Sequence, residues 1–241
     1  MNNTLRVLVV GSCGKKKRTM SEKAPRCDDL ILRSDLLKWQ RKFSSLTIQA
    51  REMYIGHQNR ELVNGVDLLR RIDNTEVYLK IISAGFGLLD ERKKIPPYDC
   101  SFSGMKKSQI IERANNLEIS KDFAKLCMNK FDLIYLALGN DYFHSLGDEW
   151  KKGLCAAVVG FNKTLSGPNI LRIPSNHRIV HALSTRGYKI HGVTGYKGDL
   201  LRILANHALS CKYPYQELLG WRNRTTLQNL ILHLSGLSNL D

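Results

Sequence analysis

Polar and charged side chains follow several apolar segments of this chain directly, at the points where those segments end. Gly11 to Arg18 (GSCGKKKR) follows one such segment, and Gly139 to His144 (GNDYFH) follows another. A carboxylate can stabilise oxocarbenium-like charge and activate water during cleavage of a glycosidic bond. Amides, imidazoles and aromatic rings can hydrogen-bond to a nucleobase or stack on it once it has left its helix. The clusters are therefore candidates for a site that acts on nucleic acid.

The candidate catalytic residues carry acid, amide or imidazole groups: Asp141, Asp99, Asn140 and His177. The candidate substrate-binding residues offer hydroxyl groups, an amide or a ring that can stack on a base: Ser12, Ser83, Phe86, Tyr98, Tyr142, Ser175 and Asn176. The candidate nucleic-acid contacts are cations that would bind phosphates without reading sequence: Lys15, Lys16, Lys17, Arg18, Arg178 and Lys197. No metal ligands are expected among these residues.

Each cluster also has an ordinary structural explanation. Asp99 can be a turn aspartate and Asp141 a helix N-cap, while Ser175 or Asn176 can cap the helix that follows. The lysines after Gly14 can form a solvated basic turn, and the glycine spacing there does not match a Walker A loop. The recurrence of such clusters after four or five successive segments favours a functional site over separate coincidences.

Three segments have the length and apolar content of buried strands: 5–10, 77–82 and 133–138. A fourth short strand is predicted at 169–173, and 189–193 is a candidate for a fifth. The segments between them, including 146–159, have the apolar spacing of helices. This alternation predicts an α/β fold with a mainly parallel sheet of four or five strands and helices on both faces. We expect a single domain over 1–241, with a C-terminal helical segment at about 197–235. Ligands of such sheets bind beyond the carboxyl ends of the strands, so the clusters should meet at one rim.

The stretch from Ile81 to Met105 joins the end of a predicted strand to a long loop and is the part of the chain richest in special residues. Two glycines within three residues, Gly85 and Gly87, indicate a sharply bent backbone. Pro96 and Pro97 stiffen the part that presents Tyr98 and Asp99. A rigid loop at the end of a buried strand is suited to holding a ligand, although an ordinary surface loop would have many of the same residues.

The charge of the chain favours an anionic partner. Lys and Arg number 37 against 22 Asp and Glu, for a formal net charge of +15. Nucleic acid, DNA in particular, is the leading partner class, with a membrane surface second. No apolar run reaches the roughly 20 residues that cross a bilayer, and the N-terminal residues lead directly into a predicted strand. We therefore expect a cytoplasmic protein that neither spans a membrane nor needs a cofactor; the sequence does not define its oligomeric state.

The six cysteines are scattered, without a C-x-x-C pair and without a Cys/His spacing typical of zinc sites. Reduced, mostly buried thiols are the expectation. Cys13 and Cys100 lie in candidate site loops, but neither has an adjacent histidine that could activate it.

Several motifs resemble known families. The GSCGKK turn from Gly11, SAGFGLL from Ser83 and IPPYD from Ile95 resemble the S-x-x-K, SA-x-(Y/F)-GL and PYD signatures of a bacterial family related to YaaA-type peroxide-stress proteins. LIYLALG from Leu133 and RIPSNHR from Arg172 are similar to the central strand and the H-P-S loop of the uracil-DNA glycosylase superfamily. The resemblance implies a uracil-DNA-glycosylase-like layout. For a basic, stand-alone protein it also implies the activity of the Brig-type anti-phage glycosylases, which remove glucosylated hydroxymethylcytosine from phage DNA.

Three functional hypotheses follow. The first is a metal-independent DNA N-glycosylase that flips a modified base into the rim pocket and uses Asp141 or Asp99 as its carboxylate. The second is a nucleic-acid-binding protein without catalysis, in which the basic loops bind phosphates. The third is an enzyme that acts on a nucleoside or nucleotide, for which the lysine-rich turn would bind a single phosphate.

Overall fold

The computed structural model describes residues 4–18 and 21–240, and it confirms the α/β class. The central sheet has the strand order β4-β3-β1-β6-β7-β8, and all of its pairs are parallel except β3 with β4. Its strands are β1 (Leu5–Ser12), β3 (Thr75–Ser83), β4 (Gly87–Asp90), β6 (Leu133–Leu136), β7 (Ala157–Gly160) and β8 (Ile170–Arg172). A separate antiparallel pair is formed by β2 (Ile48–Gln49) and β5 (Lys94–Ile95).

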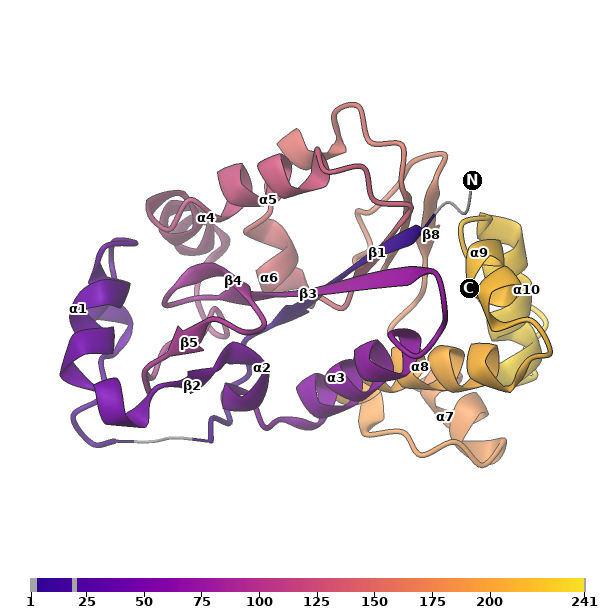
Figure 1. Cartoon of the computed structure of the whole chain (residues 1–241), viewed down its shortest axis with the longest axis horizontal. Helices are drawn as coiled ribbons and strands as arrows, with labels where there is room; N and C mark the ends of the chain where they lie inside the picture. Colours follow the sequence, from indigo (N-terminus) through magenta and orange to yellow (C-terminus); the bar gives the residue numbers. More distant parts are fainter. Residues whose placement is uncertain (1–3, 19–20, 241) are drawn as a thin grey trace.

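Helices cover both faces of the sheet, as predicted. Figure 1 shows α4 and α5 on one side of β1 and β3, with α3 and α8 on the other. The helices are α1 (Asp35–Lys42), α2 (Ala50–Met53), α3 (His57–Leu69), α4 (Lys107–Asn116), α5 (Ile119–Cys127), α6 (Asn140–His144), α7 (His177–Thr185), α8 (Gly192–Ser210), α9 (Pro214–Gly220) and α10 (Arg224–Ser235). Short 3₁₀ turns occur at Cys27–Asp29, Ser44–Leu46 and Glu149–Lys151. No helix within residues 4–18 and 21–240 is long and apolar enough to cross a membrane.

Two of the predicted elements are wrong. The segment 189–193 is not a strand: Gly187 and Gly192 both adopt positive φ, which interrupts extended backbone, and α8 begins at Gly192. The segment 146–159 is not one helix, because a single 3₁₀ turn gives way at Gly153, with φ of +67°, to the strand β7. The hairpin strand β4 was not predicted either, so the sheet has six strands instead of four or five.

The first strand, β1, occupies the middle of the sheet, with β3 and β6 on either side. Val7 to Val10 are completely buried, and β1 pairs with β3 along its whole length, from Leu5 opposite Thr75 to Ser12 opposite Ile82. The chain leaves β1 for β3 on one side and later reaches β6 on the other. The carboxyl ends of β1 and β6 therefore border the switch point at which such sheets form their ligand crevice.

The helices α3 and α8 cross at two glycines. A Cβ atom on Gly198 would lie 2.1 Å from the carbonyl oxygen of Gln58, and one on Gly65 would lie 3.0 Å from the backbone nitrogen of Arg202. Only hydrogen at these two positions permits such an approach of one backbone to the other. The crossing fixes the start of α3 beside the start of α8.

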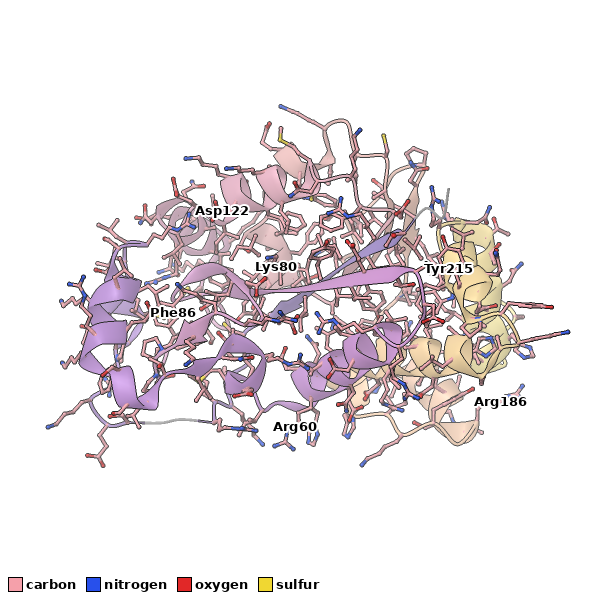
Figure 2. All side chains as sticks on the ribbon, in the orientation of Figure 1. Arg60, Lys80, Phe86, Asp122, Arg186 and Tyr215 are labelled. Atoms are coloured by element: carbon pink, nitrogen blue, oxygen red, sulfur yellow. A yellow bond between two sulfur atoms is a disulfide. The ribbon has the colours of Figure 1, made fainter. Side chains whose placement is uncertain are left out.

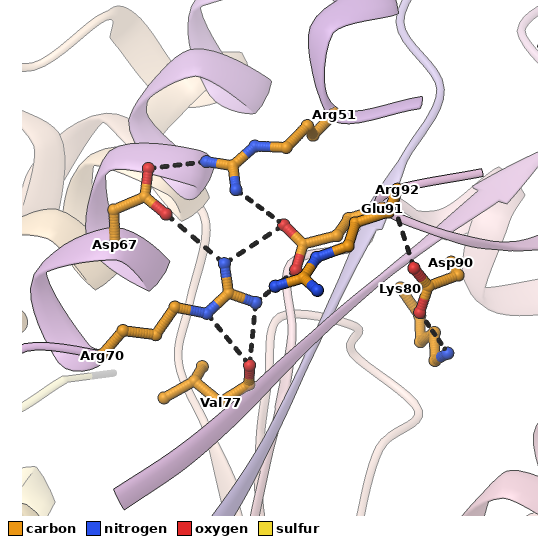
Figure 3. A network of polar contacts seen from close by, with 8 residues as sticks. All are labelled: Arg51, Asp67, Arg70, Val77, Lys80, Asp90, Glu91 and Arg92. Atoms are coloured by element: carbon orange, nitrogen blue, oxygen red, sulfur yellow. Dashed lines mark hydrogen bonds and ion pairs between the residues drawn. The ribbon is translucent and has the colours of Figure 1, made fainter. Parts of the chain in front are cut away.

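A network of charged side chains fastens α2 and α3 to the β3–β4 hairpin (Figure 3). The carboxylate of Glu91, 5% exposed, accepts hydrogen bonds from Arg51 at 3.0 Å and from both terminal nitrogens of Arg70. Arg70 also donates to the carbonyl oxygen of Val77 at 2.8 Å, and Asp67 pairs with Arg51 at 2.6 Å. A buried acid that is shared by two arginines joins three elements distant in sequence.

Glu91→Ala is expected to lower the free energy of unfolding by about 3 kcal/mol, because it leaves two largely buried guanidinium groups without their main counter-charge. Urea unfolding followed by circular dichroism measures this. Asp67→Ala is the matched control: its side chain is 49% exposed, so the cost should be about 1 kcal/mol or less. Equal losses in the two variants would contradict the central role of Glu91.

Cys27 and Cys100 form a disulfide with a sequence separation of 73, so the expectation of reduced thiols is wrong for these two residues. Cys13, Cys127, Cys155 and Cys211 are free thiols, and of these only Cys13 is fully buried. The pairing depends on the tertiary fold, which brings the 3₁₀ turn at Cys27 against the loop after Tyr98. The residues around Cys27 and around Cys100 do not indicate that the two cysteines pair.

Candidate functional site

A cavity of about 720 Å³ opens at the carboxyl ends of β1 and β6. Four segments supply most of its lining: 12–16 at the end of β1, 56–59 at the start of α3, 139–142 at the start of α6, and residues 191, 194, 195 and 197 at the start of α8. Ser103, from the long loop after β5, also lines it. The cavity therefore lies at the switch point of the sheet and has the size of a small-molecule site.

Seven of the candidate residues line this cavity. They come from the end of β1 and the loop after it, from α6 and from α8: Ser12, Lys15, Lys16, Asn140, Asp141, Tyr142 and Lys197. Asp141 is half-buried in the first turn of α6, and the N-cap of that helix is Gly139. The capping explanation for Asp141 is therefore wrong, and within residues 4–18 and 21–240 no hydrogen bond or ion pair holds its carboxylate.

Ser83, Phe86 and Tyr98 lie in the interior instead of at the rim. The hydroxyl of Tyr98 hydrogen-bonds to Ser83 Oγ and to the hydroxyl of Tyr54, each at 2.8 Å. Ser83 Oγ also accepts from the backbone nitrogens of Gly85 and Phe86. Figure 2 shows Phe86 within the body of the molecule, where its exposed fraction is 4%. These residues satisfy one another's polar groups and hold the SAGFG turn against the IPPYD segment.

Burial also determines the protonation state of Tyr98 and of Tyr142, which lines the cavity. It raises the pKa of Tyr98 well above its usual value and also raises the pKa of Tyr142. Tyr142 donates to the carbonyl oxygen of Cys13 at 2.8 Å, and its hydroxyl lies 3.0 Å from the Cys13 thiol. Both tyrosines therefore remain neutral near pH 7, and Tyr142 fastens the loop after β1 to α6.

The basic run after β1 divides into two kinds of residue. Lys15 and Lys16 are exposed at the cavity, as expected for phosphate contacts. Lys17 turns inward: it is 5% exposed, and its Nζ lies 4.4 Å from the centroid of the Tyr98 ring. Burial lowers the pKa of Lys17. Arg18 is exposed, and its backbone nitrogen donates to the carbonyl oxygen of Met53. Neither Lys17 nor Arg18 lines the cavity.

Asp99 and the cluster after β8 also lie outside the cavity lining. Asp99 is exposed, and its backbone nitrogen donates to the carbonyl oxygen of Pro25 at 2.8 Å. Asn176 caps α7 by accepting from the backbone nitrogen of Ile179 at 3.1 Å, which is the structural explanation foreseen for it.

The other candidates after β8 are Ser175, His177 and Arg178, and none of them lines the cavity. Ser175 donates to the carbonyl oxygen of Val193 at 3.4 Å, whereas His177 and Arg178 are exposed in the first turn of α7. The expected single rim is thus wrong for the loops after β3 and β8. The first turns back at once into the β4 hairpin, and the second follows an edge strand.

Several lining residues were not predicted, including His57 and His191, and neither was Asp199, which supports His191. The imidazoles of His57 and His191 stack with centroids 4.3 Å apart, joining the starts of α3 and α8. His191 Nδ1 lies 2.7 Å from Oδ1 of Asp199, whose other oxygen accepts from the backbone nitrogen of His191 at 2.8 Å. Asp199 is completely buried. With Nδ1–H donated to Asp199, Nε2 is the nitrogen left to exchange a proton with a ligand.

The contact between His191 and Asp199 was not predicted, because residues 189–193 were expected to form a strand. Placing the helix start at Gly192 puts His191 at the N-cap and Asp199 two turns further on. Glu61 lies nearby, and one ligand atom from each of Glu61, His191 and Asp199 falls within 4.8 Å of the others. These three groups could hold a metal ion. However, Glu61 also pairs with Arg202 at 2.6 Å, and both oxygens of Asp199 already accept hydrogen bonds, which favours a network that orients His191.

The electrostatics of the cavity favour anions. Lys15, Lys16 and Lys197 supply three cations, and α3, α6 and α8 begin at the cavity with their unpaired backbone N–H groups. Lys197 is only 8% exposed, and burial lowers its pKa. Its Nζ lies 5.8 Å from the centroid of the Phe161 ring. A phosphate or carboxylate of a ligand would supply the counter-charge for this buried amine.

Lys197→Met is expected to raise the free energy of unfolding by about 1 kcal/mol, because it removes the cost of burying a cation and keeps the apolar stem. The same change should weaken the binding of nucleic acid or nucleotide. Denaturant unfolding and fluorescence-anisotropy titration measure the two effects. A variant that loses both stability and binding would show that the amine supports the fold.

The fold and the cavity define a class: a doubly wound α/β protein with an anion-attracting pocket at the switch point of its sheet. No protein-family model matches the chain, and a comparison with curated proteins found no significant match.

Proposed function

We propose that this chain is a DNA N-glycosylase that takes a modified base into the cavity at the carboxyl ends of β1 and β6. The observation that carries the proposal is the joint lining of one cavity by a carboxylate, an oriented imidazole and lysines, in a chain with a net charge of +15. The resemblance of the loop and strand motifs to the uracil-DNA glycosylase superfamily supports the same activity.

The proposed reaction breaks the bond between C1′ of the sugar and the nitrogen of the base, and it adds water at C1′. Asp141 stabilises the oxocarbenium-like charge and orients the water. His191 enters the step as an imidazolium, with its Nδ1–H held by Asp199, and donates the Nε2 proton to the departing base, while Asp141 accepts the proton that the attacking water loses. Asn140, whose Oδ1 accepts from Asn162 Nδ2 at 2.9 Å, directs its own NH₂ group to the base edge. Lys15 and Lys16 bind the flanking phosphates.

The test is release of a base from duplex and single-stranded DNA of matched sequence. The substrates carry cytosine, uracil, hydroxymethylcytosine or glucosylated hydroxymethylcytosine at one position. Alkali-labile sites and chromatography of the freed base report the reaction. Release from one modified substrate supports the proposal and identifies the base; glucosylated hydroxymethylcytosine would also indicate anti-phage defence. Tight DNA binding without release from any of the substrates would reject catalysis on them and favour a nucleic-acid-binding role.

A second candidate, an enzyme acting on a free nucleoside or nucleotide, is favoured by the size of the cavity and by the two exposed lysines beside it. Salt dependence separates the candidates. Binding to DNA releases counterions from several phosphates, so log K should fall steeply with log salt; a mononucleotide neutralises few cations and gives a shallow slope.

A further inference from the structure

A second cluster of reactive side chains lies at the opposite end of α8 from the cavity. His207 and Cys211 are four residues apart at the C-terminal end of α8, and Glu217 belongs to α9. Sixteen residues of helix separate His207 from His191, which corresponds to about 24 Å along the axis. Any function of this cluster is therefore separate from the chemistry of the cavity.

The three ligand atoms converge. His207 Nε2 lies 3.7 Å from Cys211 Sγ and 3.8 Å from Glu217 Oε1, and one ligand atom from each residue falls within 4.8 Å of the others. Around a tetrahedral zinc ion, bond lengths of about 2.0 to 2.3 Å place neighbouring nitrogen, oxygen and sulfur ligand atoms about 3.3 to 3.6 Å apart. The observed separations approach this geometry, and small side-chain movements would complete it.

We propose that His207, Cys211 and Glu217 bind a Zn²⁺ ion that joins the end of α8 to α9. The donor set of imidazole, thiolate and carboxylate suits zinc, whereas magnesium and calcium prefer ligands that are all oxygen. Zinc binding transfers the thiol proton to solvent, so that sulfur coordinates as a thiolate. Three protein ligands leave the fourth tetrahedral position to water.

The surroundings permit loading of the ion. The side chains of His207 and Glu217 are 29% and 26% exposed, and Cys211 is half-buried, so an ion can reach all three without unfolding of the core. The spacing His207-x-x-x-Cys211 places both ligands on one face of a helix. The proposal departs from the expectation that the chain has no Cys/His spacing typical of zinc sites.

Titration of chelator-treated protein with Co²⁺ tests the site. One Co²⁺ per chain should produce the visible bands of tetrahedral cobalt together with a thiolate-to-cobalt charge-transfer band, and Zn²⁺ should displace it. Zn²⁺ should also raise the melting temperature of the wild-type chain. Cys211→Ser should abolish the charge-transfer band, and His207→Ala and Glu217→Gln should each weaken metal affinity by about tenfold or more.

Cys155→Ser is the matched control, since Cys155 is an exposed free thiol outside the cluster, and it should leave the titration unchanged. Circular dichroism checks that every variant is folded. A folded wild-type chain without cobalt bands, or a charge-transfer band that survives in Cys211→Ser, would overturn the proposal. The three side chains would then make only the weak thiol–imidazole contact and the ion pair.

Discussion

Asp141→Asn is expected to lower the rate of base release by about 10²- to 10⁴-fold while leaving the chain folded. The amide has nearly the same shape as the carboxylate but cannot stabilise positive charge at C1′ or accept a proton from water. Because Asp141 is half-buried and makes no cap at the start of α6, the substitution should cost little stability. Single-turnover release of the modified base measures the effect, and binding of intact DNA should change far less.

Asp99→Asn is the control, since the same chemical change is then made at an exposed carboxylate outside the cavity lining. It should leave the rate unchanged. If Asp99→Asn lost activity while Asp141→Asn kept it, Asp99 would be the catalytic carboxylate and the proposed site would be wrong. If neither variant changes a rate that is clearly measurable, neither aspartate supplies the proposed carboxylate.

The second large effect is expected for Gly198→Ala, which should lower the free energy of unfolding by about 3 kcal/mol. The added Cβ would lie 2.1 Å from the carbonyl oxygen of Gln58 and 3.0 Å from the backbone nitrogen of Leu62. Both atoms belong to the backbone of α3, so no side-chain rotation relieves the overlap. The two helices must move apart, which should also separate His57 from His191 and enlarge the cavity.

Denaturant unfolding measures the loss of stability, and titration with nucleic acid or nucleotide measures the loss of binding at the cavity. Gly220→Ala provides the control at another helical glycine, because its Cβ would meet only Cγ2 of Thr226, at 3.4 Å. That variant should be as stable as the wild type or slightly more stable. Similar stability of Gly198→Ala and Gly220→Ala would contradict a close helix crossing.

The central part of the fold could be predicted because its strands are long and uniformly apolar. Val7 to Val10 pack on both faces of the sheet, and such segments differ clearly from amphipathic helices. The short strands β4 and β7 span four residues each, which is too few to establish a period. The strand β6 is equally short, but it lies in an apolar run that continues to Leu138. The strand predicted at 189–193 does not form. Gly187, just before the segment, and Gly192, within it, adopt positive φ and interrupt the extended backbone.

The candidate site was predicted where a cluster follows a strand beside the switch point. Ser12 and Asn140 meet this condition and line the cavity. Ser83 and Tyr98 looked equally reactive, but their hydroxyl groups bond to one another inside the protein. Sequence does not distinguish a polar group that faces a ligand from one that is satisfied internally. The contact of His191 with Asp199 could be recognised only after the start of α8 was known.

The disulfide between Cys27 and Cys100 closes residues 27–100 into a covalent ring, which runs from the first 3₁₀ turn to the loop after β5. The strand β1 and the C-terminal half leave this ring as two tails. A protease that cut the largely exposed helix α1 would therefore release no fragment, and the nicked molecule would separate into two pieces only after a thiol reductant opened the ring.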